Sequence, residues 1–100
     1  MTEIEAQFHH AMIGVADFAN AHKFGFKFRL MIEQHGAVQA AKQLLATQEI
    51  QAGLIRLWEL KSLTNSMEAL VIQERFLSLF TDAEIAEAQR RLDELGYFLK

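Results

Sequence analysis

The sequence predicts an all-α protein, folded as a single domain over residues 1–100 and built as a compact bundle of about five to six short helices. Three observations predict this class. The chain has no proline and five glycines, so it contains few helix breaks. Apolar residues make up 51% of it and recur at three- and four-residue spacing. A chain of this length can bury about 65% of the surface that its unfolded form exposes, which is enough for one core.

The first helix is expected from about residue 3 to 20, because Phe8, Met12 and Val15 fall on one helical face. Thr2 and Glu5 are spaced as a capping box, in which each side chain satisfies a backbone amide that the helix leaves unpaired.

The next stretch, residues 23–29, alternates like a β-strand. A lone strand would have no partner elsewhere in the chain, so we expect a second helix that ends near His35 and Gly36.

Two short helices are expected to follow. The first carries Val38, Ala41, Leu44 and Leu45, and the second carries Ile50, Leu54, Leu57 and Trp58 after a cap at Thr47. Because Trp58 shares the apolar stripe of that second helix, we expect its indole to be mostly buried.

The last two helices have recognisable starts. Asn65 and Glu68 are spaced as a capping pair before the fifth helix. Thr81 and Glu84 form the clearest capping box, and we expect the final helix from Asp82 to Leu95, with Gly96 ending it.

No pattern of catalytic residues is present, so the sequence does not predict an enzyme or a bound cofactor. There is no cysteine, which excludes disulfides and thiolate metal sites, and no glycine-rich phosphate loop. Glu5 and His9 could supply half of a metal site, but no spacing supplies the other ligands, so no metal site is expected. The acids Glu84, Glu87, Asp93 and Glu94 alternate with Arg90 and Arg91, which predicts a solvated charged face.

The net charge is −3, which gives no overall attraction for phosphate backbones. The first five residues carry two acids and no basic residue, unlike a secretory signal, and no apolar run is long enough to cross a bilayer. We therefore expect a soluble, cytoplasmic protein.

Residues 22–29 interleave three phenylalanines with three basic residues. Phe24, Phe26 and Phe28 cannot all face one helical core, because two residues turn a helix by about 200°. Phe26 is therefore expected near the surface, and the candidate partner-binding residues are Lys23, Phe26, Lys27 and Arg29. An exposed aromatic ring beside basic groups suits either an acidic protein surface or a stacked base.

From residue 35 onward the chain resembles an uncharacterised family of small bacterial all-helical proteins, which occur alone or as tails on larger chains. The pieces that carry this resemblance, within about residues 35–97, are Gly36, Ala40-Ala41-Lys42, Leu44-Leu45, Gly53, Leu57-Trp58-Glu59, Leu63, Ser66, Glu68-Ala69-Leu70-Val71, Phe76, Leu79-Phe80-Thr81, Glu84 and Arg91-Leu92. The chain departs from the family at Gln51-Ala52-Gly53-Leu54, where relatives tend to carry a Ser-Asp-Gly-Phe turn. The resemblance implies a helical fold and no known catalytic residue.

Two functions therefore remain open. The first is a non-enzymatic protein-interaction module, either a homo-oligomer or a small inhibitor or accessory protein, phage- or mobile-element-encoded, that docks on a larger bacterial assembly. The alternative is a helical nucleic-acid-binding regulator that uses Lys23, Lys27, Arg29 and Arg56. A helix-turn-helix over residues 37–60 has few basic residues on its second helix, so it adds little to that alternative.

Overall fold

The computed structural model describes residues 2–47 and 52–99 and shows an all-α fold, as the sequence predicts. The six α-helices within these ranges are α1 (Glu3–Ala21), α2 (Phe26–His35), α3 (Ala37–Ala46), α4 (Ala52–Glu59), α5 (Met67–Val71) and α6 (Asp82–Glu94). Two short 3-10 helices, η1 (Leu63–Asn65) and η2 (Glu74–Leu79), flank α5. None of these helices is long and apolar enough to pass through a bilayer.

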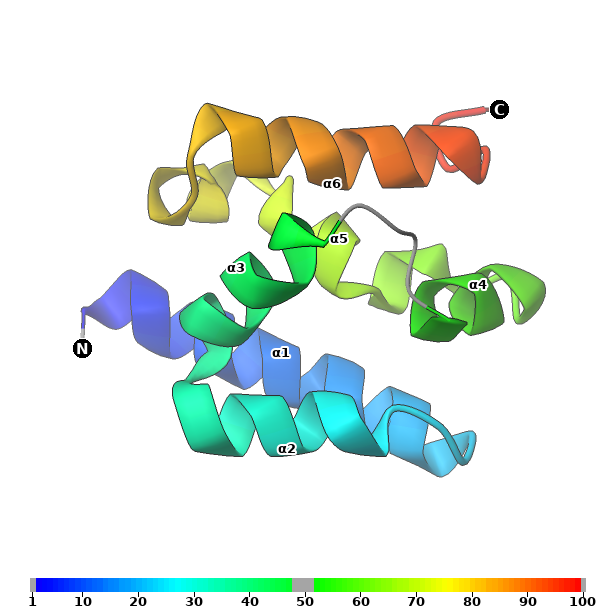
Figure 1. Cartoon of the computed structure of the whole chain (residues 1–100), viewed down its shortest axis with the longest axis horizontal. Helices are drawn as coiled ribbons and strands as arrows, with labels where there is room; N and C mark the ends of the chain where they lie inside the picture. The colour runs from blue at the N-terminus through cyan, green and yellow to red at the C-terminus, as the bar shows by residue number, and fades with distance from the viewer. Residues whose placement is uncertain (1, 48–51, 100) are drawn as a thin grey trace.

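The helices α1 and α2 form an antiparallel pair on one side of the molecule, and α6 lies on the opposite side (Figure 1). Between these two layers, α3 and α5 fill the centre, and α4 lies at the end where α1 turns into α2 (Figure 1). The molecule measures 35 × 30 × 23 Å.

The capping boxes predicted at Thr2–Glu5 and Thr81–Glu84 are both present. The start of α5 is different from the prediction. Ser66, rather than Asn65, is its N-cap, and the Ser66 hydroxyl accepts a hydrogen bond from the Ala69 amide at 3.1 Å. Asn65 belongs to η1 instead, which leaves the Glu68 side chain available for a contact with α6.

The turn between α1 and α2 takes up residues 22–25, so α2 begins at Phe26, later than expected. Lys23 and Gly25 both have positive φ angles, of 66° and 76°. A Cβ atom on Gly25 would lie 2.8 Å from the Cβ of Ala19, so only glycine fits this close approach. Asn20 closes the turn by donating a hydrogen bond to the Phe24 carbonyl at 3.1 Å.

Two apolar clusters hold the fold together. In the larger one, the ring of Phe8 on α1 packs edge-on against Phe76 and Phe80, at centroid distances of 5.0 and 5.3 Å. The smaller cluster is centred on the buried Leu54, Leu57 and Leu63, against which Phe18, Phe24, Leu95 and Tyr97 pack.

The prediction that Trp58 is mostly buried is wrong, because its side chain is 49% exposed. On α4, Leu54 and Leu57 face the smaller cluster, and Trp58 lies about 70° around the helix from the midline between them. Ile50, the first residue of the predicted stripe, lies outside the described residues. Thr47, predicted to cap that helix, is the C-cap of α3, and the residues between it and the start of α4 at Ala52 lie outside the described residues.

Candidate functional site

The four residues of the candidate patch, Lys23, Phe26, Lys27 and Arg29, lie close together in the chain but do not surround one point. Lys23 lies in the turn before α2, and the other three lie on the first turn of that helix. Steps of about 100° per residue direct Phe26, Lys27 and Arg29 to different sides. Phe26 therefore lies on the outward face of α2, Lys27 lies at the rim of a cavity described below, and Arg29 forms an ion pair with α1.

The outward face of α2 is apolar. Phe26 is 64% exposed, which confirms that one ring of this stretch lies at the surface. Leu30 follows one helical turn later and is 49% exposed. Residues four apart lie on the same helical face, so these two side chains form a continuous apolar strip.

Arg29 is turned toward α1. Its guanidinium forms an ion pair with Asp17 and a longer one with Glu33, at 3.5 Å. Arg29 therefore contributes less free positive charge to the patch than the sequence suggests.

A cavity of about 690 Å³ opens between α1, α2, α3, α4 and α5. Its wall is mainly apolar, and its α2 side consists of Phe24 in the preceding turn and of Lys27, Phe28 and Met31 on the helix. The other apolar residues that line it are Val15, Ala19, Leu44, Ala52, Leu54, Leu57 and Met67. Because Met31 and Met67 belong to the larger cluster and Leu54 and Leu57 to the smaller one, the cavity lies where the two clusters meet.

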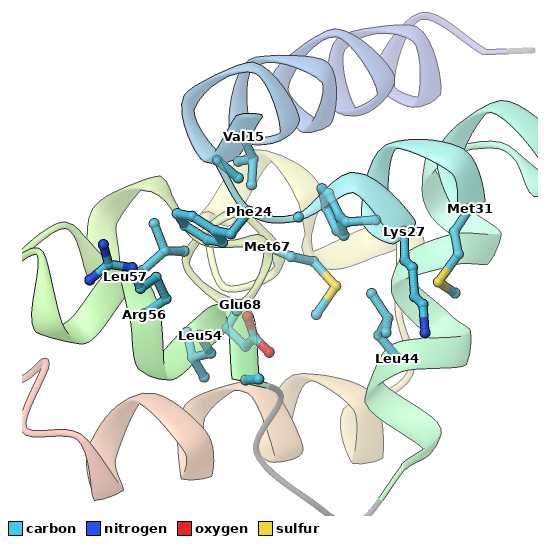
Figure 2. Close-up of a pocket in the computed structure, with 15 residues that line it drawn as sticks. Val15, Phe24, Lys27, Met31, Leu44, Leu54, Arg56, Leu57, Met67 and Glu68 are labelled. Atoms are coloured by element: carbon cyan, nitrogen blue, oxygen red, sulfur yellow. The ribbon is translucent and has the colours of Figure 1, made fainter. Parts of the chain in front are cut away.

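Two exposed cations stand on opposite sides of this cavity, Lys27 on α2 and Arg56 on α4, with Phe24, Met67 and Glu68 between them (Figure 2). Within the part of the chain that the structure describes, neither forms an ion pair or a hydrogen bond through its side chain. The rim of the cavity is therefore positively charged although the chain as a whole is negative.

The floor of the cavity is fixed by Arg91, whose side chain is completely buried. Its guanidinium donates to Glu68 of α5 at 3.2 Å and to Glu87 of α6 at 2.6 Å. It also donates to the carbonyls of Leu44 and Thr47 at 3.0 and 2.7 Å, which closes the C-terminal end of α3. One side chain thus ties α3, α5 and α6 together directly behind two cavity-lining residues, Leu44 and Glu68.

The two acids that meet Arg91 differ in their surroundings. Burial raises the pKa of Glu68, although a backbone hydrogen bond and the nearby Arg91 oppose this. Hydrogen bonds from Arg90, and then from Arg91, lower the pKa of Glu87 from 4.5 to about 2, in spite of its partial burial. Glu87 is thus firmly ionised at neutral pH and supplies the main counter-charge for Arg91.

The sequence prediction that Arg91 belongs to a solvated charged face is wrong. Arg90 does lie on that face, where it pairs with Glu87 and Glu94 at 2.7 and 2.6 Å. Arg91 lies one position further around α6, beside the buried Leu92, and points inward. A signal for this contact was present in the sequence, since Glu68 directly precedes the apolar run Ala69-Leu70-Val71 and Arg91 directly precedes Leu92.

Glu5, which with His9 could supply half of a metal site, is engaged at the start of α1 instead. The Glu5 carboxylate accepts hydrogen bonds from the Thr2 amide and hydroxyl, at 3.2 and 2.9 Å. Among residues 2–47 and 52–99, no group of three or more His, Asp or Glu side chains is placed to hold a metal ion.

No protein-family model, curated protein or solved structure matches this chain.

Proposed function

We propose that this protein is a non-enzymatic protein-interaction module that docks through the outward face of α2. The observation that carries this proposal is the strip formed by Phe26 and Leu30, two large apolar side chains exposed one turn apart. Aromatic residues exposed in this way are the usual anchors of protein interfaces.

The positive charges beside the strip indicate which kind of partner surface would fit it. Lys23 and Lys27 are exposed on either side of Phe26 along the chain. A partner with an apolar pocket and acidic residues around it would complement both features. A small inhibitor or accessory protein, encoded by a phage or a mobile element and docking on a larger bacterial assembly, fits this size and composition. The resemblance to a family of small bacterial helical proteins belongs to the same proposal.

The second candidate is a nucleic-acid-binding regulator, favoured by the exposed cations Lys23, Lys27 and Arg56. The ion pairs of Arg29 and the net charge of −3 weaken it. A titration with labelled single- and double-stranded oligonucleotides at rising salt separates the two candidates. Binding that falls steeply with salt would replace the docking proposal by this one.

The docking proposal is tested with a photo-reactive phenylalanine analogue at position 26, expressed in the native host. The matched control carries the same analogue at position 99, because Leu99 is also exposed but lies at the other end of the chain. We expect one cross-linked protein from position 26 and not from position 99.

The cross-linked protein supports the proposal only if it also binds the purified chain. The double variant Phe26→Ala, Lys27→Glu should then weaken binding by about fivefold or more, with an unchanged melting temperature. Normal binding by this double variant, in a chain that still folds, would show that the outward face of α2 is not the docking surface.

A further inference from the structure

The cavity between α2 and α4 has the features of a ligand site, and Lys27 is the one residue that it shares with the docking proposal. Its volume of about 690 Å³ falls within the range of roughly 300 to 1,000 Å³ that small-molecule sites occupy. Phe26 and Leu30 do not line it, so it is separate from the outward strip of α2.

We propose that this cavity binds an aliphatic carboxylate, with the hydrocarbon chain inside and the carboxylate at the rim, beside Lys27 or Arg56. The apolar wall selects the chain, because each methylene that leaves water for this wall is stabilised. The walls are contributed by rigid elements, since Val15 is on α1, Met31 on α2, Leu57 on α4 and Met67 on α5.

The charges select a carboxylate head group. On α2, Arg29 has its counter-charges within the chain, while Lys27, two residues earlier, has none among the described residues. Among the same described residues, Arg56 has no carboxylate partner on the opposite side of the cavity (Figure 2). An anion at the rim would meet one of these two cations, and an ammonium head group would be repelled by both.

Glu68 fixes the direction in which the ligand lies. Its buried carboxylate lines the inner part of the cavity and is engaged by Arg91 at 3.2 Å. A second carboxylate placed beside it would be repelled in a site with little water. The head group therefore stays at the exposed cations, and the chain points toward Met67 and Leu44.

Calorimetric titration with dodecanoate, below its micelle concentration, tests this proposal. The comparison ligand is dodecyltrimethylammonium, which has the same chain length and the opposite charge. We expect dodecanoate to bind with one site per chain, and the cationic ligand to bind at least about tenfold more weakly. Absence of dodecanoate binding, or equal affinity for both ligands, would overturn the proposal.

Variants then locate the site. Lys27→Gln or Arg56→Gln, whichever cation holds the head group, should weaken dodecanoate binding by about fivefold. The control Arg75→Gln removes the same charge at residue 75, which does not line this cavity, and should leave binding unchanged. Equal losses in all three variants would mean that net charge, rather than this rim, binds the ligand.

Gly53→Leu tests whether the chain enters the cavity. Gly53 is a helical residue of α4 that lines the cavity, and an added Cβ would meet only the Phe24 ring, at 4.0 Å. The new side chain should therefore fill the cavity, abolish dodecanoate binding and leave the fold intact, which a melting curve checks. Unchanged dodecanoate binding in folded Gly53→Leu would place the ligand elsewhere.

Discussion

Arg91 joins α3, α5 and α6 through hydrogen bonds that few other side chains could make. A guanidinium offers five N–H donors in a planar fork, and here they reach acids on α5 and α6 and two carbonyls at the end of α3. A buried charge is tolerated only when it is paired and hydrogen-bonded in this way. The neighbouring Arg90 makes its ion pairs at the surface, so the two arginines form a natural comparison.

The first prediction compares them. Arg91→Ala should lower the free energy of unfolding by about 3 to 5 kcal/mol, because it removes the cation that pairs with the buried Glu68 carboxylate and one donor to the Leu44 carbonyl near the end of α3. Arg90→Ala should cost less than about 1 kcal/mol, since its pairs are exposed. Urea unfolding curves for both variants measure the difference. Equal losses would show that Arg91 has no special part in the fold.

The second prediction concerns the stability of the protein at low pH. Because the pKa of Glu87 is lowered from 4.5 to about 2, its ion pairs stabilise the fold above pH 4.5, and this contribution is lost as the pH falls from 4.5 toward 2. Burial raises the pKa of Glu68, so the contribution of Glu68 to stability has the opposite sign: it stabilises the fold as the pH falls and Glu68 becomes protonated.

Denaturation curves between pH 2 and pH 6 isolate the Glu87 contribution when the chain is compared with Glu87→Gln. The wild-type chain should be the more stable of the two at pH 6, and the difference should shrink toward pH 2. A difference that stays constant over this range would contradict the assigned pKa.

At the scale of elements, the two helix starts that carry a complete capping box were predictable, whereas the starts of α2 and α5 were not. A capping box involves residues three apart, so Thr2 with Glu5 and Thr81 with Glu84 could be recognised without any tertiary information. The burial of Arg91 and the exposure of Trp58 could not be recognised in the sequence, because both depend on which face of a helix is covered by another element. The outward position of Phe26 was predictable from helical geometry, whereas the pairing of Arg29 with Asp17 required the α1–α2 turn. No pattern in the sequence indicated the cavity, whose walls come from five helices.

The third prediction tests a helix start. Thr81→Ala should destabilise the protein by about 0.5 to 2 kcal/mol, because the Thr81 hydroxyl accepts from the Glu84 amide at 3.2 Å. Thr81→Ser keeps this hydroxyl and should retain most of the stability. Thermal melting of the two variants measures their stabilities. An equal loss of stability in both would mean that the methyl group of Thr81, rather than its capping hydroxyl, stabilises the protein.

The fourth prediction concerns α4. Leu57→Ala should cost about 2 to 5 kcal/mol, because Leu57 is buried in the smaller cluster, while Trp58→Ala should cost less than about 1.5 kcal/mol. The half-exposed indole should also emit at a longer wavelength than a buried tryptophan. Urea unfolding and the emission spectrum together check this, and a larger loss for Trp58→Ala would reverse the assignment of the buried face.

At the scale of the whole molecule, the two apolar clusters meet without filling the space between them. Arg91 closes this space from behind, and Lys27 and Arg56 stand at its open side. The ligand site proposed between α2 and α4 depends on this arrangement, whereas the proposed docking surface is the separate outward strip of Phe26 and Leu30.

The most direct test is a nuclear magnetic resonance titration of the protein with labelled methionine methyl groups, using dodecanoate as the probe. Met31 and Met67 line the cavity, whereas Met12 is completely buried in the larger cluster and does not line it. The methyl signals of Met31 and Met67 should move and saturate together, while the signal of Met12 stays in place. Unmoved signals for Met31 and Met67, or equal movement of all three, would contradict a binding site between α2 and α4.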